Sequence, residues 1–331
     1  MFTRPDDLSD DDIVAALVDG WGLAANEVEY AAVGFGSHHW RVTSDGERWF
    51  VNVDDLDARK RDASETRAEA ARRLAAALDI ARSLRDGGLE FVVAPVPTRA
   101  NHIIHPIRDR YVVSLFEHVD GDAHSWSPYP SGVDRLAVLD RIVAVHTIRL
   151  GGVFPGDDFA IPSRDQLTAA LANPATGWGP GPYATPTQEL VRQHGAAIQR
   201  ALVRYDQLVD HVANGGRRRV LTHGEPHRGN TIDTADGVAL IDWDTALLAP
   251  PERDLWMLID EDPHIAADYT ERTGIEVDDH ALQLYQLWWD LCEISLFVAE
   301  FRQPHDDTED TRIAWAGLAR FLDPTRWSHL I

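Results

Sequence analysis

The chain has 331 residues, a formal net charge of −23 at pH 7 and a hydrophobic content of 44%. Such a length allows one large domain or two lobes, each with a substantial core. The negative charge argues against nucleic-acid binding, which needs a basic surface to displace counterions from phosphates. An acidic surface would attract a cationic small molecule, but it serves solubility equally well.

No apolar run approaches the length of a membrane span, so no membrane partner is expected. The segment 1–7 is acidic and lacks the apolar core of a signal peptide. The single cysteine, Cys292, cannot form an intrachain disulfide, which favours a reducing cytoplasm. A cytoplasmic globular protein is therefore expected, and its oligomeric state stays open.

The first third of the chain predicts a mixed α/β unit. Ser9 followed by acidic residues predicts the N-cap and first turn of a short helix that ends at Gly20. From Val28 the pattern alternates with a period of two, which predicts strands joined by turns at 34–37 and 45–46. The predicted strands are 28–33, 39–43, 48–53, 91–94, 102–104 and 111–116, and a long Ala- and Arg-rich helix is predicted over 62–84.

Beyond Gly121 the composition turns helical, with predicted helices over 131–148, 188–212, 263–273 and 279–301. The Pro- and Gly-rich segments 151–162 and 173–187 are too long for simple turns, so they form either a lid over a substrate or surface insertions. In the last helix, apolar side chains at helical spacing predict one buried stripe, formed by Leu282, Tyr285, Trp289, Cys292 and Leu296.

The stretch from Arg219 to Trp256 concentrates the candidate chemistry. After a short apolar lead-in, a polar loop with Gly and Pro residues holds Glu225 and Asn230. A predicted hairpin follows, and its return strand over 238–241 delivers Asp242 and Asp244 at its end. Two strands thus bring Glu225, Asn230 and Asp242 into one small volume, and such hard oxygen ligands suit Mg²⁺.

The order and spacing of His223-Gly224-Glu225, Asn230 and Ile241-Asp242-Trp243 resemble the catalytic core of the aminoglycoside phosphotransferases. The spectinomycin-phosphorylating branch is the most similar in length and loop pattern. The resemblance implies an α+β, bilobal protein-kinase-like fold, with a nucleotide-binding lobe at 1–119 and a catalytic and acceptor-binding lobe at 120–331. It also implies ATP or GTP as donor, Mg²⁺ as cofactor, and a hydroxyl of a small, cationic molecule as acceptor.

The family's site residues carry over by position. Glu225 stands at the catalytic base, Asn230 and Asp242 stand at the Mg²⁺ ligands, and Asp254 stands at an aspartate that is usually structural. The turn that covers the phosphates in the family corresponds to Gly34, Gly36 and Ser37, although an ordinary hairpin turn explains these residues equally well. The hinge that binds adenine through its backbone corresponds to Glu117 and Val119. Candidate acceptor contacts are Asp244, Trp289, Asp290 and Glu293.

Two positions depart from the family pattern. Asn52 occupies the place of the strand lysine that pairs with the nucleotide phosphates, and the sole lysine, Lys60, lies several residues farther on. An asparagine donates a hydrogen bond to phosphate but brings no charge. The missing charge would have to come from Mg²⁺ or from one of four basic residues, Arg41, Arg48, His38 and Arg228. Glu225 replaces the family's aspartate, and together the two changes make a catalytically impaired, nucleotide- or metabolite-binding relative the main alternative.

A metal-dependent hydrolase is the weaker alternative, because His223, Glu225 and His227 lie close together in the sequence. They alternate as His-x-Glu-x-His, whereas zinc proteases need His-Glu-x-x-His so that both imidazoles share one face of a helix. The zinc deaminase pattern also fails, because it needs Pro-Cys-x-x-Cys and the chain has a single cysteine, Cys292.

Overall fold

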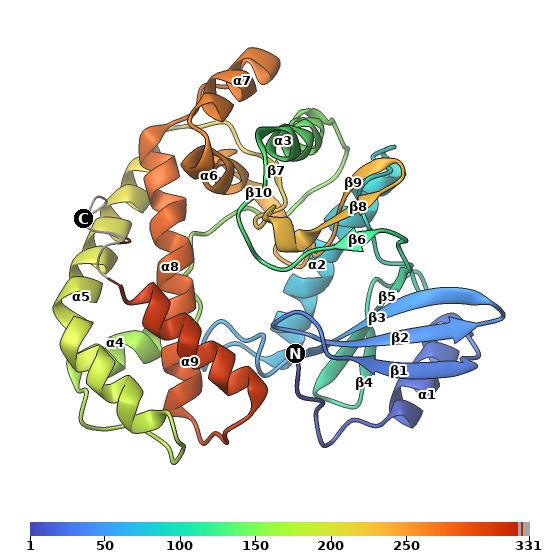
Figure 1. Ribbon diagram of the computed structural model, residues 1–331, viewed down its shortest axis with the longest axis horizontal. Coiled ribbons are helices and arrows are strands. Elements are labelled where there is room, and N and C mark those ends of the chain that lie inside the picture. Colours follow the sequence, from blue (N-terminus) through green and yellow to red (C-terminus); the bar gives the residue numbers. More distant parts are fainter. Residues whose placement is uncertain (324–325, 327–331) are drawn as a thin grey trace.

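The computed structural model describes residues 1–323 and 326, which form two lobes (Figure 1). An antiparallel five-stranded sheet with the order β1-β2-β3-β5-β4 forms the core of the N-terminal lobe. Its strands are β1 (Glu27–Ala31), β2 (His38–Ser44), β3 (Glu47–Asp55), β4 (His105–Ile107) and β5 (Tyr111–Glu117). Its helices are α1 (Asp10–Trp21) and α2 (Arg67–Asp86).

The two faces of this sheet pack against different helices, because side chains alternate along each strand. Val113 of β5 packs with Ile13 of α1 in one core cluster. Val112 and Phe116 of the same strand pack with Leu74 of α2 in another. The period of two predicted over 111–116 therefore corresponds to burial of alternate side chains on the two faces of the sheet.

Helix α1 begins where the sequence predicts because Ser9 and Asp12 cap it reciprocally. Ser9 Oγ accepts a hydrogen bond from the backbone N–H of Asp12 at 3.2 Å, and the Asp12 carboxylate accepts one from the N–H of Ser9 at 2.9 Å. The helix runs past Gly20 and ends at Gly22, whose φ of 71° supplies the left-handed C-cap.

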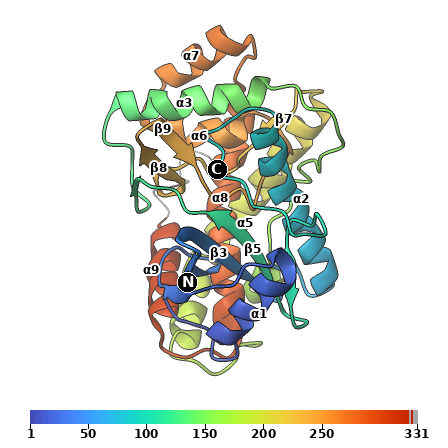
Figure 2. The same cartoon turned by 90° about the vertical axis from the view of Figure 1, so that its right-hand side faces the viewer.

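Helix α2 belongs to both lobes. Its first half packs on the N-terminal sheet, while Ile80 and Leu84 in its second half join a core cluster that contains Leu240 and Ile142 of the C-terminal lobe. Figure 2 shows α2 running alongside the junction between the lobes. Helix α2 therefore fixes the position of the N-terminal sheet relative to the hairpin that contains Leu240.

The C-terminal lobe is mainly helical. Its helices are α3 (Gly132–Thr147), α4 (Arg164–Ala172), α5 (Ala184–Asn214), α6 (Glu252–Glu261), α7 (His264–Thr273), α8 (Asp279–Arg302) and α9 (Glu309–Phe321). Its short strands are β6 (Asp122–Ala123), β7 (Val220–Thr222), β8 (Thr231–Thr234), β9 (Gly237–Leu240) and β10 (Leu247–Ala249). Strand β8 pairs with β9 as the predicted hairpin and with β6 on its other edge, and β7 pairs with β10.

Helix α8 lies at the centre of this lobe, in contact with α4, α5, α6 and α9 (Figure 1). The predicted single buried stripe is wrong, because packing on several sides buries almost the whole circumference. Leu287 and Ile294, which lie outside the stripe, are buried, whereas Leu296, which was assigned to it, is 39% exposed.

Other local predictions need correction too. The segment 91–94 forms no strand and makes only an isolated bridge between Val92 and Leu240. The strand expected at 102–104 lies at His105–Ile107. Helices α4, α6 and α9 are absent from the elements that the sequence predicts. Among the described residues, no helix combines the length and apolarity needed to cross a bilayer.

Candidate active site

The fully buried Asp254 of α6 holds the loop after β7 in place. The Asp254 carboxylate accepts hydrogen bonds from the backbone N–H groups of His223 at 2.8 Å and Gly224 at 2.6 Å. His223 in turn donates from Nε2 to the carbonyl of Ile241 at 2.8 Å and accepts from the N–H of Glu225 at Nδ1 at 3.2 Å. These contacts tie the loop to both α6 and the end of the hairpin.

Position 224 requires glycine because the side chain of an arginine lies close to its backbone. Its φ is +104°, and a Cβ built there would lie 2.4 Å from Nη1 of Arg253. Arg253 cannot move away easily, because it is buried and donates to Thr222 Oγ1 and to the carbonyl of Thr245, both at 3.0 Å. The loop path therefore depends on the absence of a side chain here.

We expect Gly224→Ala to lower the free energy of unfolding by about 2–4 kcal/mol, because it adds a clash to an unfavourable φ. Gly216→Ala is the matched control, since Gly216 also has a left-handed φ, +60°, but a Cβ there meets no atom within 4 Å. That control should cost only about 1 kcal/mol. Denaturant unfolding measures both, and equal losses would contradict the role assigned to the Arg253 contact.

Glu225 directs its side chain into a partly open acidic region. Its side chain is 26% exposed, and its carboxylate lies 4.0 Å from Nε2 of His227. Burial, and then the neighbouring carboxylates of Asp244 and Glu293, raise the pKa of Glu225 to about 8. With this pKa, Glu225 of the metal-free protein is largely protonated at pH 7, and a cation bound nearby would favour the charged carboxylate that a general base needs.

Asn230 and Asp242 lie beside Glu225, as the sequence predicts. The Asn230 side chain donates from Nδ2 to the backbone carbonyl of Glu225 at 3.0 Å. The backbone carbonyl of Asn230 accepts from the N–H of Ile241 at 3.0 Å. Asp242 follows with a φ of +64°, a left-handed conformation that is uncommon for a residue with a side chain. Its side chain is accessible to solvent but closely surrounded by protein.

The residues at this site fit a divalent cation. Desolvation, and then the carboxylates of Asp244 and Glu225, raise the pKa of Asp242 well above its usual value. Carboxylates that repel one another in this way are stabilised when a cation sits among them. The oxygens of Asn230 and Asp242 are the hard ligands that Mg²⁺ takes, and they leave room for water and phosphate in its shell.

This cluster predicts a pH-dependent response to metal. Between about pH 4.5 and pH 8, folded Glu225 keeps a proton that the unfolded chain has lost, so this carboxyl lowers stability as pH rises through that window. A bound cation favours the charged carboxylates. Mg²⁺ with ADP should therefore raise the melting temperature more at about pH 8 than at about pH 6, with ADP alone as the control. An equal rise at both values would mean that no metal reaches the cluster.

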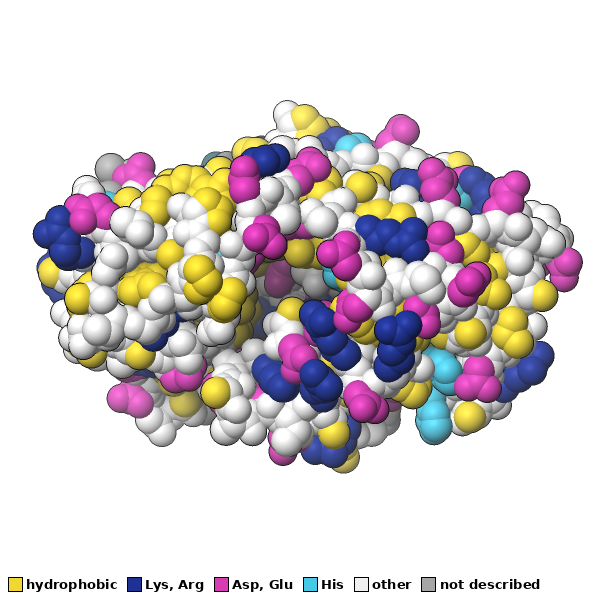
Figure 3. All heavy atoms as spheres, turned by 90° about the horizontal axis from the view of Figure 1, so that it is seen from below, with side chains coloured by type: hydrophobic (Ala, Val, Ile, Leu, Met, Phe, Trp, Pro, Cys, Tyr) yellow, Lys and Arg dark blue, Asp and Glu magenta, His cyan; other side chains and the backbone are white. Residues whose placement is uncertain are grey.

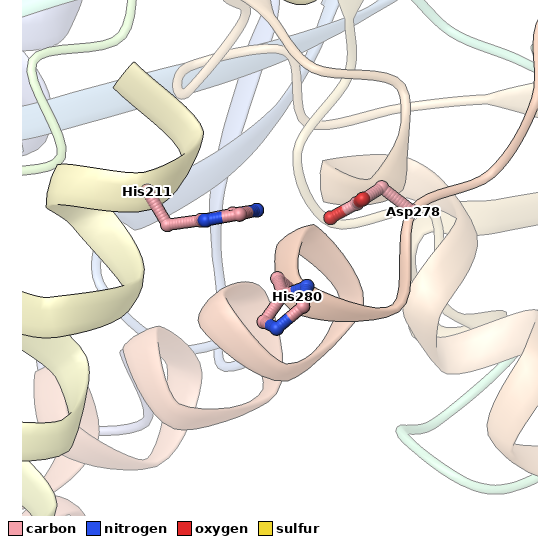
Figure 4. A group of neighbouring side chains, drawn as sticks. All are labelled: His211, Asp278 and His280. Carbon is pink, nitrogen blue, oxygen red and sulfur yellow. The ribbon is translucent and has the colours of Figure 1, made fainter. Parts of the chain in front are cut away.

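His223 is poorly placed to hold zinc. Both ring nitrogens of His223 are already hydrogen-bonded to the backbone, and the ring is buried. Within the described residues, a group with metal-ligand spacing lies elsewhere, at His211, Asp278 and His280 (Figure 4). His280 is about 20 Å along α8 from Glu293, at 1.5 Å per residue. Asp278 already caps α8 through the N–H of Ala281 and pairs with Arg217.

A family model described as the phosphotransferase enzyme family matches residues 27–291 of the chain. The chain belongs to this phosphotransferase family. Protein StrN of Streptomyces griseus is 29% identical to it over 259 residues, which cover 76% of this chain and 77% of that protein.

Two solved structures resemble this phosphotransferase along its whole length. A spectinomycin phosphotransferase in complex with ADP and spectinomycin has a TM-score of 0.71 at 15% identity, covering 97% of this chain and 98% of that one. An amicoumacin kinase in complex with AMP-PNP and Ca²⁺ has a TM-score of 0.60 at 14% identity, covering 97% and 94%. The bilobal α+β protein-kinase-like fold expected from the sequence is confirmed.

The glycine-containing turn between β1 and β2 reaches across to the C-terminal lobe. Gly34 and Gly36 have φ values of +69° and +97°, and the ring of Phe35 contacts that of Phe297 in α8 at 6.2 Å between centroids. Ser37 is buried and donates to the Asp54 carboxylate at 2.7 Å. The turn thus lies at the interface between the lobes, where the family resemblance expects nucleotide phosphates.

The hinge candidates lie where the chain leaves the N-terminal sheet. Glu117 ends β5 opposite Trp49 of β3, and His118 donates its backbone N–H to the carbonyl of Arg48 at 3.1 Å. Val119 follows, and the chain then enters β6 of the other lobe. Adenine binding by the backbone of Glu117 and Val119 stays a prediction.

The acceptor candidates on α8 have different environments. Asp290 is 6% exposed and accepts from Arg326 at 2.7 and 3.1 Å, so an arginine already neutralises it. Burial, and then Asp290, raise the pKa of Glu293 to about 7. Trp289 is buried, and its ring lies 6.2 Å from that of His227. Asp244, which is not on α8, pairs with Arg59, a residue that is not among the basic candidates predicted from the sequence.

Proposed function

We propose that this phosphotransferase moves the γ-phosphoryl group of ATP or GTP to a hydroxyl of a small, cationic acceptor. The observation that carries the proposal is the convergence of Glu225, Asn230 and Asp242 on one loop and hairpin. Figure 3 shows a hollow between the side with the C-terminal helices and the side with the N-terminal sheet, and an acidic side chain is visible in its depth. A donor and an acceptor need such access from solvent.

Phosphoryl transfer asks the protein mainly for positioning and charge stabilisation. Asn230 and Asp242 would hold Mg²⁺, whose charge offsets that of the phosphate oxygens. Glu225 would orient the acceptor hydroxyl and accept its proton while the acceptor oxygen bonds to the γ-phosphorus. The bond between that phosphorus and the bridging oxygen breaks in the same step, and the nucleoside diphosphate leaves with the electron pair.

A cationic acceptor is supported by the charge beside Glu225. Glu293 faces the same region and raises the pKa of Glu225, and no arginine lies close enough to form a salt bridge with Glu293 among the described residues. The rings of Trp126 and Trp289 flank His227 at 6.3 and 6.2 Å, and the Trp126 ring already carries a cation, the guanidinium of Arg320 at 4.2 Å from the ring centroid. Spectinomycin, which is bound in the related complex, is an aminocyclitol, so it combines cationic amino groups with hydroxyls.

A mass-spectrometric screen tests the proposal. The protein, Mg²⁺ and either ATP or GTP are incubated with aminocyclitols, aminoglycosides and small amino alcohols, and products are inspected for one added phosphoryl group. A phosphorylated product supports the proposal and identifies the acceptor class. Nucleotide binding without transfer to any acceptor would favour the impaired relative, and stoichiometric zinc in the purified protein would favour the hydrolase.

A further inference from the structure

The third strand of this chain has no basic side chain at the position of the family's lysine. Asn52 occupies the position at which the resembling family has lysine, and its Oδ1 lies 3.0 Å from Nδ1 of His39. The His39 ring stacks on Phe50 at 5.3 Å, and burial lowers the pKa of His39 to about 4, so the imidazole is neutral near pH 7. The pair is therefore a neutral polar contact within the sheet.

An arginine beyond the end of this strand reaches the site instead. Arg59 donates from Nε and Nη2 to the Asp54 carboxylate at 2.9 and 2.6 Å, and from Nη2 to Ser37 Oγ at 2.8 Å. From Nη1 it donates to Asp244, which lies across the interface in the C-terminal lobe. Its side chain is only 20% exposed. One guanidinium thus joins the end of β3, the glycine-containing turn and the segment that carries Asp242.

The other basic residues near the site lie elsewhere. Arg48 pairs with the exposed Asp120, and Lys60 pairs with Asp57. Arg228 contacts His124. Arg253 is closer, but it lies beneath the loop and donates to Thr222 and Thr245.

Two further candidates from the sequence have other surroundings. Arg41 lies on β2 with its side chain exposed, and His38 contacts Tyr30 through Nδ1 at 3.2 Å. Arg59 is the basic side chain that the described structure holds between the glycine-containing turn and Asp244.

We propose that Arg59 is the phosphate-binding cation of this phosphotransferase and replaces the lysine that its third strand lacks. The inference rests on the proposed nucleotide-dependent function. Its basis is the position of the guanidinium, which contacts both the turn expected to cover the phosphates and the Asp244 carboxylate beside the Mg²⁺ candidates.

The donor geometry of arginine suits this role. A guanidinium has five N–H donors in a fixed plane, and four of them are used by Asp54, Ser37 and Asp244 among the described residues. One Nη1 hydrogen remains on the side of Asp244, and the charge of the group is delocalised over all three nitrogens. Asp54 and Ser37 hold the arm, so Nη1 can bond a phosphate oxygen without loss of these two anchors.

Titration calorimetry with Mg²⁺–ATP and with adenosine tests the proposal, because adenosine has the base and sugar but no phosphates. Arg59→Gln should weaken Mg²⁺–ATP binding by about 10- to 100-fold, the range for a lost hydrogen bond to a charged group, and should leave adenosine binding within about twofold. Arg61→Gln is the matched control. Arg61 also links the lobes, through Asp158, but it does not contact the turn or Asp244.

Two further variants separate a phosphate contact from a folding defect. In Asp54→Asn/Arg59→Gln the buried carboxylate of Asp54 is replaced by an amide, and only the more exposed Asp244 loses its ion-pair partner, so this double variant should fold and should bind Mg²⁺–ATP as weakly as Arg59→Gln. Adding Asn52→Lys to Arg59→Gln restores a cation at the strand and should recover part of the Mg²⁺–ATP affinity.

Unchanged Mg²⁺–ATP affinity in Arg59→Gln and in the double variant would overturn the proposal. Equal losses for ATP and adenosine would also overturn it, since they would show that Arg59 only holds the lobes together. Failure of the wild-type protein to bind either ligand would refute the nucleotide-dependent function itself. If instead the wild type and Arg59→Gln bind Mg²⁺–ATP equally well, only the role of Arg59 is refuted. The two failures can therefore be told apart.

Discussion

Asp242→Asn is expected to lower phosphoryl transfer by about 10³-fold or more while making the metal-free protein more stable. Loss of the carboxylate removes the main candidate ligand of Mg²⁺, and preorganised charge at the transferring group contributes on this scale. Stability should rise because desolvation and repulsion from Asp244 and Glu225 hold the pKa of Asp242 high, which means that its charged form is unfavourable in the folded state. Turnover assays and thermal melts without metal measure the two effects.

Asparagine is a better probe than alanine at this position. The φ of +64° strains most residues, but asparagine tolerates it about as well as aspartate does, so the variant changes charge and leaves the backbone alone. Asp236→Asn, an exposed aspartate in the turn of the same hairpin, is the matched control and should change neither quantity. Full Mg²⁺-dependent nucleotide affinity in Asp242→Asn would remove Asp242 from the metal site.

Much of the site could be predicted from the sequence because its signals are local. The spacing from Glu225 to Asn230 and the turn before Gly237 place Asp242 near both residues, and the structure brings these three residues together. The cap at Ser9 is equally local. Each feature depends on residues a few positions apart, so a pattern read along the chain captures it.

Arg59 could not be predicted in this way. Asp54 is only five residues from Arg59, but Ser37 and Asp244 are far from it along the chain, and the contact with Asp244 exists only because the two lobes close on each other. The same reason explains the misread burial of α8, since the number of helices that pack around it is set by the tertiary fold and not by its own apolar pattern. Long-range contacts leave little trace in one sequence.

Glu225→Gln is expected to lower turnover by about 10²–10⁴-fold, the usual contribution of a positioned general base, with Mg²⁺–nucleotide affinity close to that of the wild type. The carboxylate would contact the acceptor and not the phosphates, and glutamine keeps its shape without the ability to take a proton. Glu300→Gln is the matched control, because burial also raises the pKa of Glu300, to about 7, at a position farther along α8.

Glu225→Asp distinguishes a site built around glutamate from a site that has lost its aspartate. The structure holds the backbone of this loop rigidly through Asp254 and His223, so the shorter side chain cannot be compensated by a shift of the loop. Turnover should therefore fall in Glu225→Asp as well, because the carboxylate would end short of the acceptor hydroxyl. Faster transfer in this variant would show instead that glutamate impairs an otherwise intact site. Equal turnover in Glu225→Gln and the wild type would end the assignment of Glu225 as the base.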